Sequence, residues 1–388
     1  MDVRALLLVN RTAEELADPI PLSPLPPPLL EVAGKTPLQR TVERLRRFGA
    51  QTVTVLTEAD VLPPASSGNG HGETYLNTVR ERYWRTAESA FNDVAQEGAE
   101  LVLVMSLGPY AEIDFEKLVQ FHLDKHARVT QAYNQSQPLQ IFCISASRRN
   151  DAASLLRSQL SRCRVECAHF EHTGYVNPLQ DARDLRQLAI DILTLKTETT
   201  PCGTQVRPGI WIGKGALIEK GARLVAPAFV GAMAKIRTHA VITRCSSIEH
   251  HGEVDCGTVT ENSTVLPYCR VGAGLDVAHS VIGAAVIANL RRDATVEVLD
   301  PKLIGYVAAA AGQRFLNAAM EFAAYLPRQA WQGLFGKEKP AQPDLQTALG
   351  QTSPALGNAA GYQAPACDAN AAEEFPSSLA VVRRYGHQ

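Results

Sequence analysis

The run Ser247–Gly257, with the sequence SIEHHGEVDCG, holds the densest set of residues that could do chemistry. Two adjacent imidazoles, His250 and His251, lie in it. The same run supplies carboxylates and a thiol, at Glu249, Glu253, Asp255 and Cys256. An imidazole beside a carboxylate can act as a general base, and imidazole with thiolate can bind zinc. What these side chains do depends on how the surrounding chain folds.

Around this run, aliphatic residues recur at every sixth position. They are Val206, Ile212, Ile218, Leu224, Val230, Ile236, Ile242, Ile248 and Val254, and, after a slip of one residue, Val259, Val265, Val271 and Val277. Small residues follow four places later, at Ala216, Ala222, Ala228, Ala234, Ala240, Ser246, Gly252, Thr258 and Ser263. A period of six fits neither a helix nor a simple alternating strand, but it fits a solenoid built from six-residue units.

This pattern resembles the hexapeptide repeat of left-handed β-helices, in which three units make one triangular coil. The resemblance implies about four coils between Val206 and Ile282. We expect the aliphatic side chains to point into the coil. The small residues are expected to let the chain turn its corners without a clash.

The coil length decides which histidines can meet. Coils of about 18 residues stack positions that lie 18 apart along one edge. His239 and His251 are 12 positions apart, and His251 and His279 are 28 apart. The histidines therefore do not form a ligand stack, and we expect polar corner residues in solvent or against a partner subunit. The alternative is a hexapeptide-repeat acyltransferase that uses His250 or His251 as its base.

The N-terminal part of the chain predicts an α/β domain. Continuous apolar runs at Arg4–Val9, Gln51–Leu56 and Leu101–Met105 are typical of strands buried on both faces of a parallel sheet. Helices are expected at Pro37–Phe48, Glu73–Glu97 and Phe115–Lys125. Alternating strands and helices predict a doubly wound sheet with a ligand crevice at the carboxyl ends of its strands.

Four segments occur in an order and wording that match a known family. They are Pro26–Gly49 (PPPLLEVAGKTPLQRTVERLRRFG), Ile113–Ala127 (IDFEKLVQFHLDKHA), Gly174–Leu193 (GYVNPLQDARDLRQLAIDIL) and Val265–Gly283 (VLPYCRVGAGLDVAHSVIG). Together they resemble the sugar-1-phosphate nucleotidyltransferases, or nucleotide-sugar pyrophosphorylases, of the mannose-1-phosphate guanylyltransferase-like plan. The resemblance implies a nucleotidyltransferase-like sheet domain followed by a left-handed β-helix.

The resemblance also implies a chemistry whose residues this chain lacks. The family brings a G-x-G-x-R-L loop and a P-K-P lysine to the triphosphate, and two aspartates to Mg²⁺. Here the loop has no glycine and only Arg11, and Pro27 stands at the lysine position. The two metal positions fall near Ser106 and at Pro178. Mg²⁺ prefers carboxylate oxygens, so we expect no metal and no other cofactor.

The function expected from these departures is that of a catalytically degenerate family member, because a fold can outlast its site. Such a protein would bind a nucleotide sugar, a sugar phosphate or a partner enzyme as a regulator or scaffold in polysaccharide precursor supply. The alternative is an active sugar-1-phosphate nucleotidyltransferase with an atypical site. In that case Lys35, Arg11, Glu112 or Asp114 would take substitute roles, and Mg²⁺ would be required.

The composition indicates which partners the protein does not bind and in which compartment it acts. The formal charge of −2 over 388 residues argues against a nucleic-acid or anionic-membrane surface. Eight cysteines without CxxC pairs suggest a reducing cytoplasm. No apolar run is long enough to span a membrane.

The expected domains are an α/β domain at 1–195, the β-helix at 203–298, a helical appendage at 301–335 and a disordered tail at 336–388. The appendage is rich in alanine with aromatic residues at helical spacing, but its polar face lacks the lysines of a membrane-surface helix. The tail is rich in Ala, Gly, Pro and Gln, and its apolar, basic end could dock onto a protein partner. Exposed coil sides and ends favour a homo-oligomer.

Overall fold

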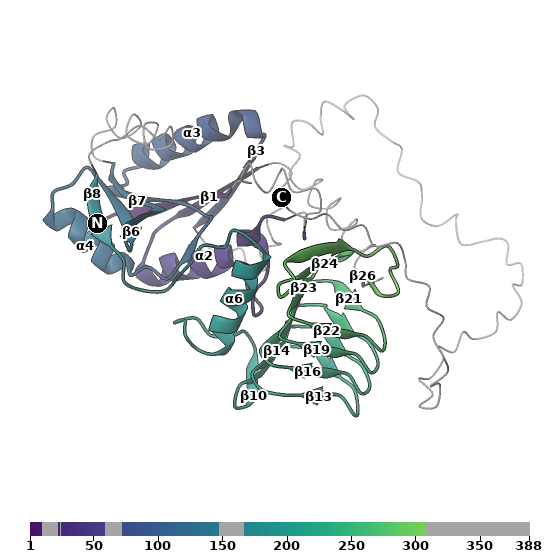
Figure 1. Ribbon diagram of the computed structural model, residues 1–388. Helices are drawn as coiled ribbons and strands as arrows, with labels where there is room; N and C mark the ends of the chain where they lie inside the picture. Colours follow the sequence, from purple (N-terminus) through teal and green to yellow (C-terminus); the bar gives the residue numbers. More distant parts are fainter. Residues whose placement is uncertain (10–21, 24, 59–71, 147–166, 308–388) are drawn as a thin grey trace, which may run out of the picture. The chain divides into compact units, whose positions relative to one another are not determined.

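The computed structural model describes residues 1–9, 22–23, 25–58, 72–146 and 167–307, which all belong to one compact unit (Figure 1). An α/β sheet domain comes first, and a region of many short parallel strands in three sheets follows it. This confirms the expected α/β domain, and the parallel strands are compatible with a β-helix.

A seven-stranded sheet forms the N-terminal domain, in the order β3-β2-β1-β4-β7-β6-β8. Its strands are β1 (Val3–Val9), β2 (Val53–Glu58), β3 (Glu73–Thr78), β4 (Leu101–Ser106), β6 (Val129–Asn134), β7 (Gln137–Ser145) and β8 (Ala168–Glu171). The first four strands are parallel, whereas β7 pairs antiparallel with β4 and β6. Every residue of β1 is buried, as expected of a central strand.

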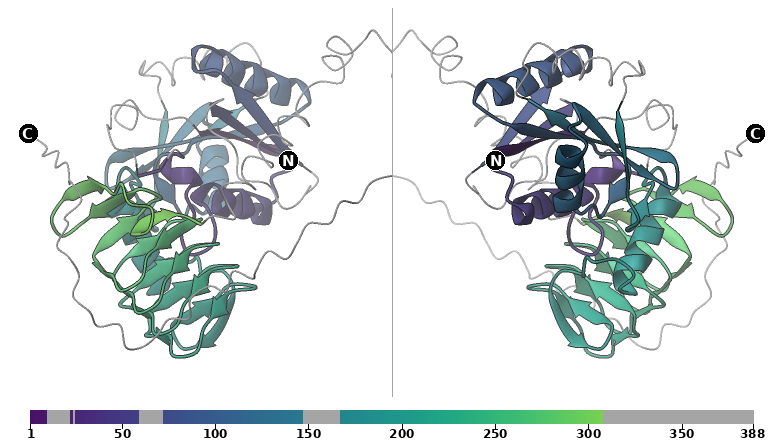
Figure 2. Two further views of the ribbon diagram at one scale, coloured as in Figure 1. Left: turned by 90° about the vertical axis from the view of Figure 1, so that its right-hand side faces the viewer. Right: turned by 90° about the vertical axis from the view of Figure 1, so that its left-hand side faces the viewer.

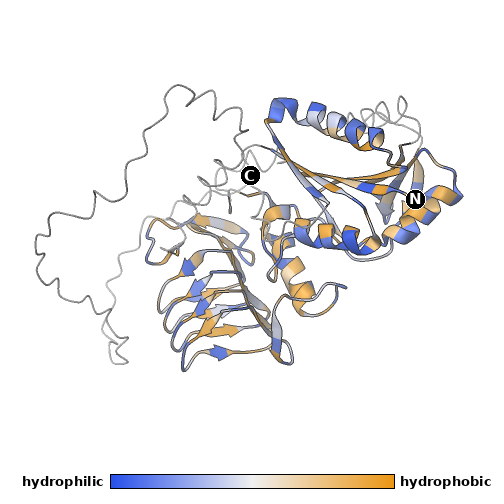
Figure 3. Ribbon diagram, turned by 180° about the vertical axis from the view of Figure 1, so that it is seen from behind, coloured by the Kyte–Doolittle hydropathy of each residue, from blue (hydrophilic) through white to orange (hydrophobic). Residues whose placement is uncertain are grey.

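Three helices cover the two faces of this sheet (Figures 1 and 2). Helices α2 (Pro37–Phe48) and α4 (Phe115–Asp124) share a hydrophobic core with Ala5 and Leu7 of β1. Helix α3 (Tyr83–Gln96) packs on the opposite face, with Leu6 and Leu8. Successive residues of one strand thus serve two cores. Each helix carries hydrophobic and hydrophilic residues on different sides (Figure 3).

Helix α2 begins and ends at the predicted residues. The hydroxyl of Thr36 accepts a hydrogen bond from the Gln39 amide, and the Gln39 side chain accepts one from the Thr36 amide. At the other end, Gly49 adopts φ +98°, a left-handed conformation that favours glycine. A short 3-10 helix, η1 (Pro27–Leu29), precedes this region.

The prediction of a helix over Glu73–Glu97 is wrong in its first part. Residues Glu73–Thr78 form the edge strand β3 beside β2, and α3 begins only after the 3-10 helix η2 (Arg80–Arg82). Pairing with β2 fixes this segment, and that long-range contact leaves no signature in a polar sequence such as ETYLNT. The β6–β7 hairpin was also missed, although its strands are neighbours in the chain and β7 carries the apolar run Ile141–Ile144.

Very short strands in three sheets build the second region (Figure 1). The first sheet holds β10 (Thr204–Arg207), β11 (Ile210–Ile212), β14 (Ala228–Val230), β17 (Ser246–Ile248), β20 (Thr264–Val265), β23 (Ser280–Ile282), β24 (Val286–Asn289) and β25 (Ala294–Glu297). The second holds β12 (Leu217–Ile218), β15 (Lys235–Ile236), β18 (Glu253–Val254), β21 (Cys269–Val271) and β26 (Ile304–Tyr306). The third holds β13 (Arg223–Leu224), β16 (Val241–Thr243), β19 (Val259–Glu261) and β22 (Asp276–Ala278). We call residues 204–307 as a whole the coil. The expressions "one coil", "the middle coils" and "the last coil" refer to its single turns.

The register of the coil confirms the six-residue repeat. Along the first sheet, Val230 pairs with Ile248 and Ile248 pairs with Val265. The predicted inward aliphatic residues of the middle coils have no exposed surface, at Val230, Ile236, Ile242, Ile248, Val254, Val265 and Val271. Their burial stabilises the coil by roughly 1.5–3 kcal/mol for each side chain.

Two predicted inward positions are wrong. Val206 is 50% exposed, because β10 runs antiparallel to β11 and its ladder is irregular between Gln205 and Arg207. Thr260, not Val259, pairs with Ile242 and is fully buried, so the one-residue slip falls after it. The Thr260 hydroxyl finds no hydrogen-bond partner within the described residues.

Antiparallel strands cover the last coil. β24 and β25 extend the first sheet, and β26 pairs with β21. The prediction of a helical appendage at 301–335 is therefore wrong for Ile304–Tyr306, which form a strand with Ile304 buried opposite Val271. The rest of that helix and the tail, residues 308–388, lie outside the described residues.

Helix α6 (Ala182–Leu193) packs against the coil rather than against the sheet. Its residues Leu185, Leu188 and Ile192 belong to the same buried cluster as the coil aliphatics. Its Arg186 guanidinium is buried and donates to the carbonyl oxygens of Cys245 (2.7 Å) and Asn262 (3.1 Å). Helix α6 and the coil thus share one hydrophobic core.

Candidate functional site

Lys35, one of the candidate residues for an active nucleotidyltransferase, lies at the end of a tight turn. Val32 and Lys35 form an isolated antiparallel bridge, and we call residues 32–35 the VAGK turn. The Lys35 ammonium is 2.5 Å from a carboxylate oxygen of Glu43 on α2, and both side chains are about one-third exposed. Lys35 is thus paired within its own segment.

Buried polar groups hold the VAGK turn on both sides. Arg40 donates to the carbonyl oxygens of Val32 (2.7 Å) and Ala33 (3.3 Å). On the other side, Glu249 accepts hydrogen bonds from the amides of Ala33 and Gly34, each at 2.9 Å. Gly34 has φ +88°, and a Cβ there would lie 2.8 Å from the Cys202 Cβ, so only glycine fits.

Glu249 is a buried carboxylate that belongs to the coil. It has no exposed surface, and it also accepts a short hydrogen bond from the Ser247 hydroxyl. Burial, together with the nearby charge of Glu31, raises the pKa of this carboxyl to about 7, against the lowering effect of its hydrogen bonds. The sequence flagged Glu249 only as a neighbour of the two histidines.

His250 and His251 do meet other functional side chains. The Nδ1 of His250 lies 3.0 Å from Glu31, and its Nε2 lies 2.9 Å from the Tyr268 hydroxyl. His251 stacks on the Tyr268 ring with centroids 5.0 Å apart. Burial, and next the neighbouring His250, lower the pKa of His251. Glu31, His250 and Tyr268 therefore form a continuous hydrogen-bonded chain that a proton could follow.

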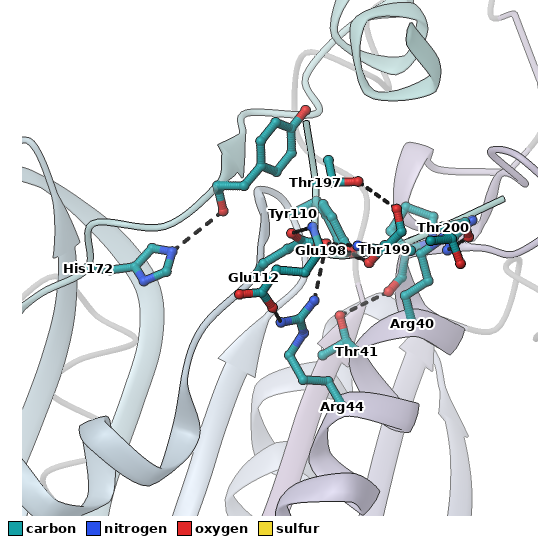
Figure 4. Close-up of polar contacts among 12 residues, drawn as sticks. Arg40, Thr41, Arg44, Tyr110, Glu112, His172, Thr197, Glu198, Thr199 and Thr200 are labelled. Carbon is teal, nitrogen blue, oxygen red and sulfur yellow. Dashed lines mark hydrogen bonds and ion pairs between the residues drawn. The ribbon is translucent and has the colours of Figure 1, made fainter. Parts of the chain in front are cut away.

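Glu112 lies at the centre of a polar network in the sheet domain (Figure 4). It is only 3% exposed and lies 3.1 Å from the guanidinium of Arg44 on α2. It accepts hydrogen bonds from the Tyr110 hydroxyl (3.0 Å), the Glu198 amide (2.7 Å) and the amide and hydroxyl of Thr199. Oε1 is therefore fully occupied within the chain, whereas Oε2 accepts only the Glu198 amide.

This network ties the chain segment after α6 to helix α2. Arg44 bridges Glu112 and the exposed Glu198, and Arg40 donates to the carbonyl oxygen of Thr200 (Figure 4). The Thr197 hydroxyl donates to the Thr199 carbonyl oxygen. These contacts fix the path of the chain between α6 and the coil.

Asp114 serves the fold as well. Its carboxylate accepts the Lys117 amide at 3.1 Å, which makes it the N-cap of α4, and it pairs with the Lys117 ammonium. Burial opposes ionisation slightly, but these contacts with Lys117 hold the pKa of Asp114 below its ordinary value. A capping aspartate of this kind stabilises a helix by about 1 kcal/mol.

The two positions expected for metal ligands lie in the chain just before and just after the same end of a small antiparallel sheet. Ser106 ends β4, and Pro178 follows β9 (Val176–Asn177), which pairs with β5 (Tyr110–Ala111). Neither residue offers a carboxylate. Across the described residues there is no group of three or more His, Cys, Asp or Glu side chains that could hold a metal ion. Arg11 lies outside the described residues.

Sequence reasoning missed two members of the histidine cluster. Tyr268 lies one coil after His251, 17 positions on because of the one-residue slip, so only a search that allowed for the slip would have found it. Glu31 has no such signal, because the VAGK region reaches the coil only through the tertiary fold.

The part of the chain that the structure describes contains no helix long and apolar enough to cross a membrane. No protein-family model matches the sequence, and no curated protein is significantly similar to it.

Proposed function

We propose that this chain is a nucleotidyltransferase-like protein without metal-dependent turnover. It binds a nucleotide sugar, a sugar phosphate or a partner enzyme, and it regulates or scaffolds polysaccharide precursor supply. In this proposal the sheet domain is doubly wound, the coil is a left-handed β-helix, and the protein acts in the cytoplasm.

This proposal rests on the ion pair and hydrogen bonds that already occupy Glu112. Attack of a sugar phosphate on a nucleoside triphosphate needs charge neutralisation, which this family obtains from Mg²⁺ held by carboxylates. With Ser106 and Pro178 at the metal positions, Glu112 is the nearest carboxylate after β4 that could substitute. It is already bound by Arg44 and four hydrogen-bond donors, so a metal would have to break that network. The residues therefore do not fit Mg²⁺.

A second candidate function rests on the Glu31–His250–Tyr268 chain. A carboxylate on Nδ1 and a hydroxyl on Nε2 are the contacts of an imidazole that acts as a general base. This geometry supports a hexapeptide-repeat acyltransferase in which His250 activates an acceptor hydroxyl. It requires acyl-CoA consumption that His250→Ala abolishes, with His239→Ala, at another corner of the coil, as the matched control.

The experiment that separates the proposal from an active sugar-1-phosphate nucleotidyltransferase is a pyrophosphate assay. The full chain is incubated with each pair of a sugar-1-phosphate and a nucleoside triphosphate, with Mg²⁺. The proposal predicts no pyrophosphate release with any pair, whereas nucleotide-sugar binding is measurable by calorimetry. Release at enzymatic rates, abolished by Lys35→Ala or Asp114→Ala, would establish an active transferase instead.

The partners belong to the same proposal. Stacked coils with open sides favour a homo-oligomer, and the C-terminal residues are proposed to dock onto a protein partner. Sedimentation of the full chain and of a chain ending at residue 335 would test both points.

A further inference from the structure

The third sheet of the coil, built from β13, β16, β19 and β22, carries two rows of outward side chains (Figure 1). Side chains alternate between the two faces of a strand, so the neighbours of the fully buried Ile242 and Thr260 point outward. The first outward row, in register from strand to strand, is Arg223, Val241, Val259 and Asp276. The second row, two residues further along the chain, is Val225, Thr243, Glu261 and Ala278. We call these two rows the outer face.

The centre of the outer face is apolar. Val241 and Val259 are neighbours in the first row, and both are partly exposed. Neither valine belongs to the core cluster that contains Ile242. Val225, at the start of the second row, is 43% exposed. Stacked valines that the core does not use are typical of a surface that another molecule covers.

Opposite charges lie at the two ends of the first row. Arg223 and Asp276 are both exposed, and neither has an ion-pair partner within the part of the chain that the structure describes. Neighbouring strands lie about 4.8 Å apart, so three intervals separate Arg223 from Asp276 by about 14 Å. The two charges are therefore too far apart to pair within one chain.

A second copy of the outer face is complementary to the first when the coils of the two copies run in opposite directions. A two-fold axis between the faces, parallel to the strands, brings Arg223 of each copy opposite Asp276 of the other. The same rotation places Val241 of each copy opposite Val259. Coils that run in the same direction would bring the two Arg223 side chains to one level and the two Asp276 side chains to another, so opposite charges would not meet.

The second row fits the same rotation. Val225 of each copy comes opposite Ala278 of the other, so the apolar surface continues across both rows. Thr243 comes opposite Glu261, whose carboxylate can accept a hydrogen bond from the threonine hydroxyl. Every position of the outer face thus meets a residue of matching chemistry.

We propose that the outer face binds a second copy of this chain, with the two coils antiparallel and Arg223 of each copy paired with Asp276 of the other. This gives the homo-oligomer proposed above a two-fold arrangement and a defined surface. The inference rests on that homo-oligomer, but it is independent of nucleotide-sugar binding and of the lack of turnover.

Charge reversal in the full chain tests the pairing by sedimentation equilibrium. Arg223→Glu places a carboxylate opposite Asp276, and Asp276→Arg places a guanidinium opposite Arg223. The symmetry repeats each contact, so either variant alone should raise the dissociation constant of the dimer by at least about tenfold. In an equimolar mixture of the two variants, opposite charges meet at both contacts. The mixture should therefore dimerise with a dissociation constant within about threefold of the wild type.

The control and the mixture decide between the outer face and other surfaces. Lys214→Glu reverses an exposed cation between β11 and β12, outside the third sheet, and should leave the dissociation constant unchanged. Recovery of the dimer in the mixture also shows that both variants are folded. Weakening that the mixture does not reverse would overturn the antiparallel pairing.

The wild type separates this inference from the wider proposal. An oligomeric wild type that neither charge reversal weakens would overturn the outer face alone, because the oligomer would then use another surface. A monomeric wild type would overturn both the outer face and the homo-oligomer, and nucleotide-sugar binding, measured separately by calorimetry, would be unaffected.

Discussion

Two buried carboxylates of this chain, Glu112 and Glu249, hold neighbouring backbone segments in similar ways but differ in how their charge is met. Each accepts two backbone amides, and Glu112 accepts two hydroxyls where Glu249 accepts one. Glu112 also has the guanidinium of Arg44 at 3.1 Å, whereas Glu249 touches no cation among the described residues. The same carboxylate–amide contact is therefore ion-paired in one place and has no cation partner among the described residues in the other.

The largest expected effect comes from breaking the ion-paired joint. Glu112→Gln leaves the mostly buried Arg44 guanidinium without its buried counter-charge. Loss of one partner from such a pair costs about 3–5 kcal/mol. We expect the urea midpoint of the full chain to fall accordingly, with Glu116→Gln, an exposed residue of α4, as the control. A loss below about 0.5 kcal/mol would show that Arg44 does not depend on Glu112.

A double-mutant cycle sharpens the same point. Arg44→Met combined with Glu112→Gln removes both charges, so no buried charge is left unpaired. We expect the double variant to be more stable than the sum of the two single losses predicts, by up to about 3 kcal/mol. Additive losses would contradict direct coupling between Arg44 and Glu112.

Thr260 tests whether buried polar groups need partners in this fold. Its hydroxyl is buried in the coil and unpaired within the described residues, unlike the hydroxyls that bind the two carboxylates. Thr260→Val replaces that hydroxyl with a methyl group of similar size, which should stabilise the coil by roughly 1 kcal/mol. Thermal unfolding measures the change, and a lower midpoint would mean that an unseen partner satisfies Thr260.

The effect of Glu249→Gln at pH 7.5 should be smaller than that of Glu112→Gln, because no cation is left unpaired. The new NH2 group meets the N–H of Ala33 or Gly34 and leaves a buried donor without an acceptor, so the free energy of unfolding should fall by about 1–3 kcal/mol. Because the pKa of Glu249 is raised in the folded chain, its contribution to stability is greatest below pH 4.5 and is lost as the pH rises through about 7. Urea unfolding from pH 5 to pH 8 should therefore show a smaller decline in the variant than in the wild type. An equal decline in both proteins would contradict a raised pKa for Glu249 in the folded chain.

The parts of this fold that the sequence predicts are those that local or periodic rules specify. The limits of α2 follow from Thr36, Gln39 and Gly49, and the stacking of the coil follows from aliphatic residues at six-residue spacing. The edge strand β3 was mistaken for helix because pairing with a distant strand decides its conformation.

The candidate site was less predictable than the fold. The sequence placed His250 and His251 at a corner of the coil, but their partners Glu31 and Tyr268 depend on tertiary contacts and on the exact slip of the repeat. Glu112 could be named as a candidate but not assigned a role, because the donors that occupy it come from distant segments. Hydrogen bonding across such distances has no local sequence rule.

The most direct test of the account is a search for a divalent-metal site after β4. Mn²⁺, which can replace Mg²⁺ and is visible by electron paramagnetic resonance, is titrated into the full-length wild type, Glu112→Gln and Asp114→Asn. The account predicts that free Mn²⁺ is the same for all three, with no site tighter than about 1 mM that depends on either carboxylate. A Mn²⁺ site in the wild type that either variant abolishes would contradict it and return this chain to the active transferases.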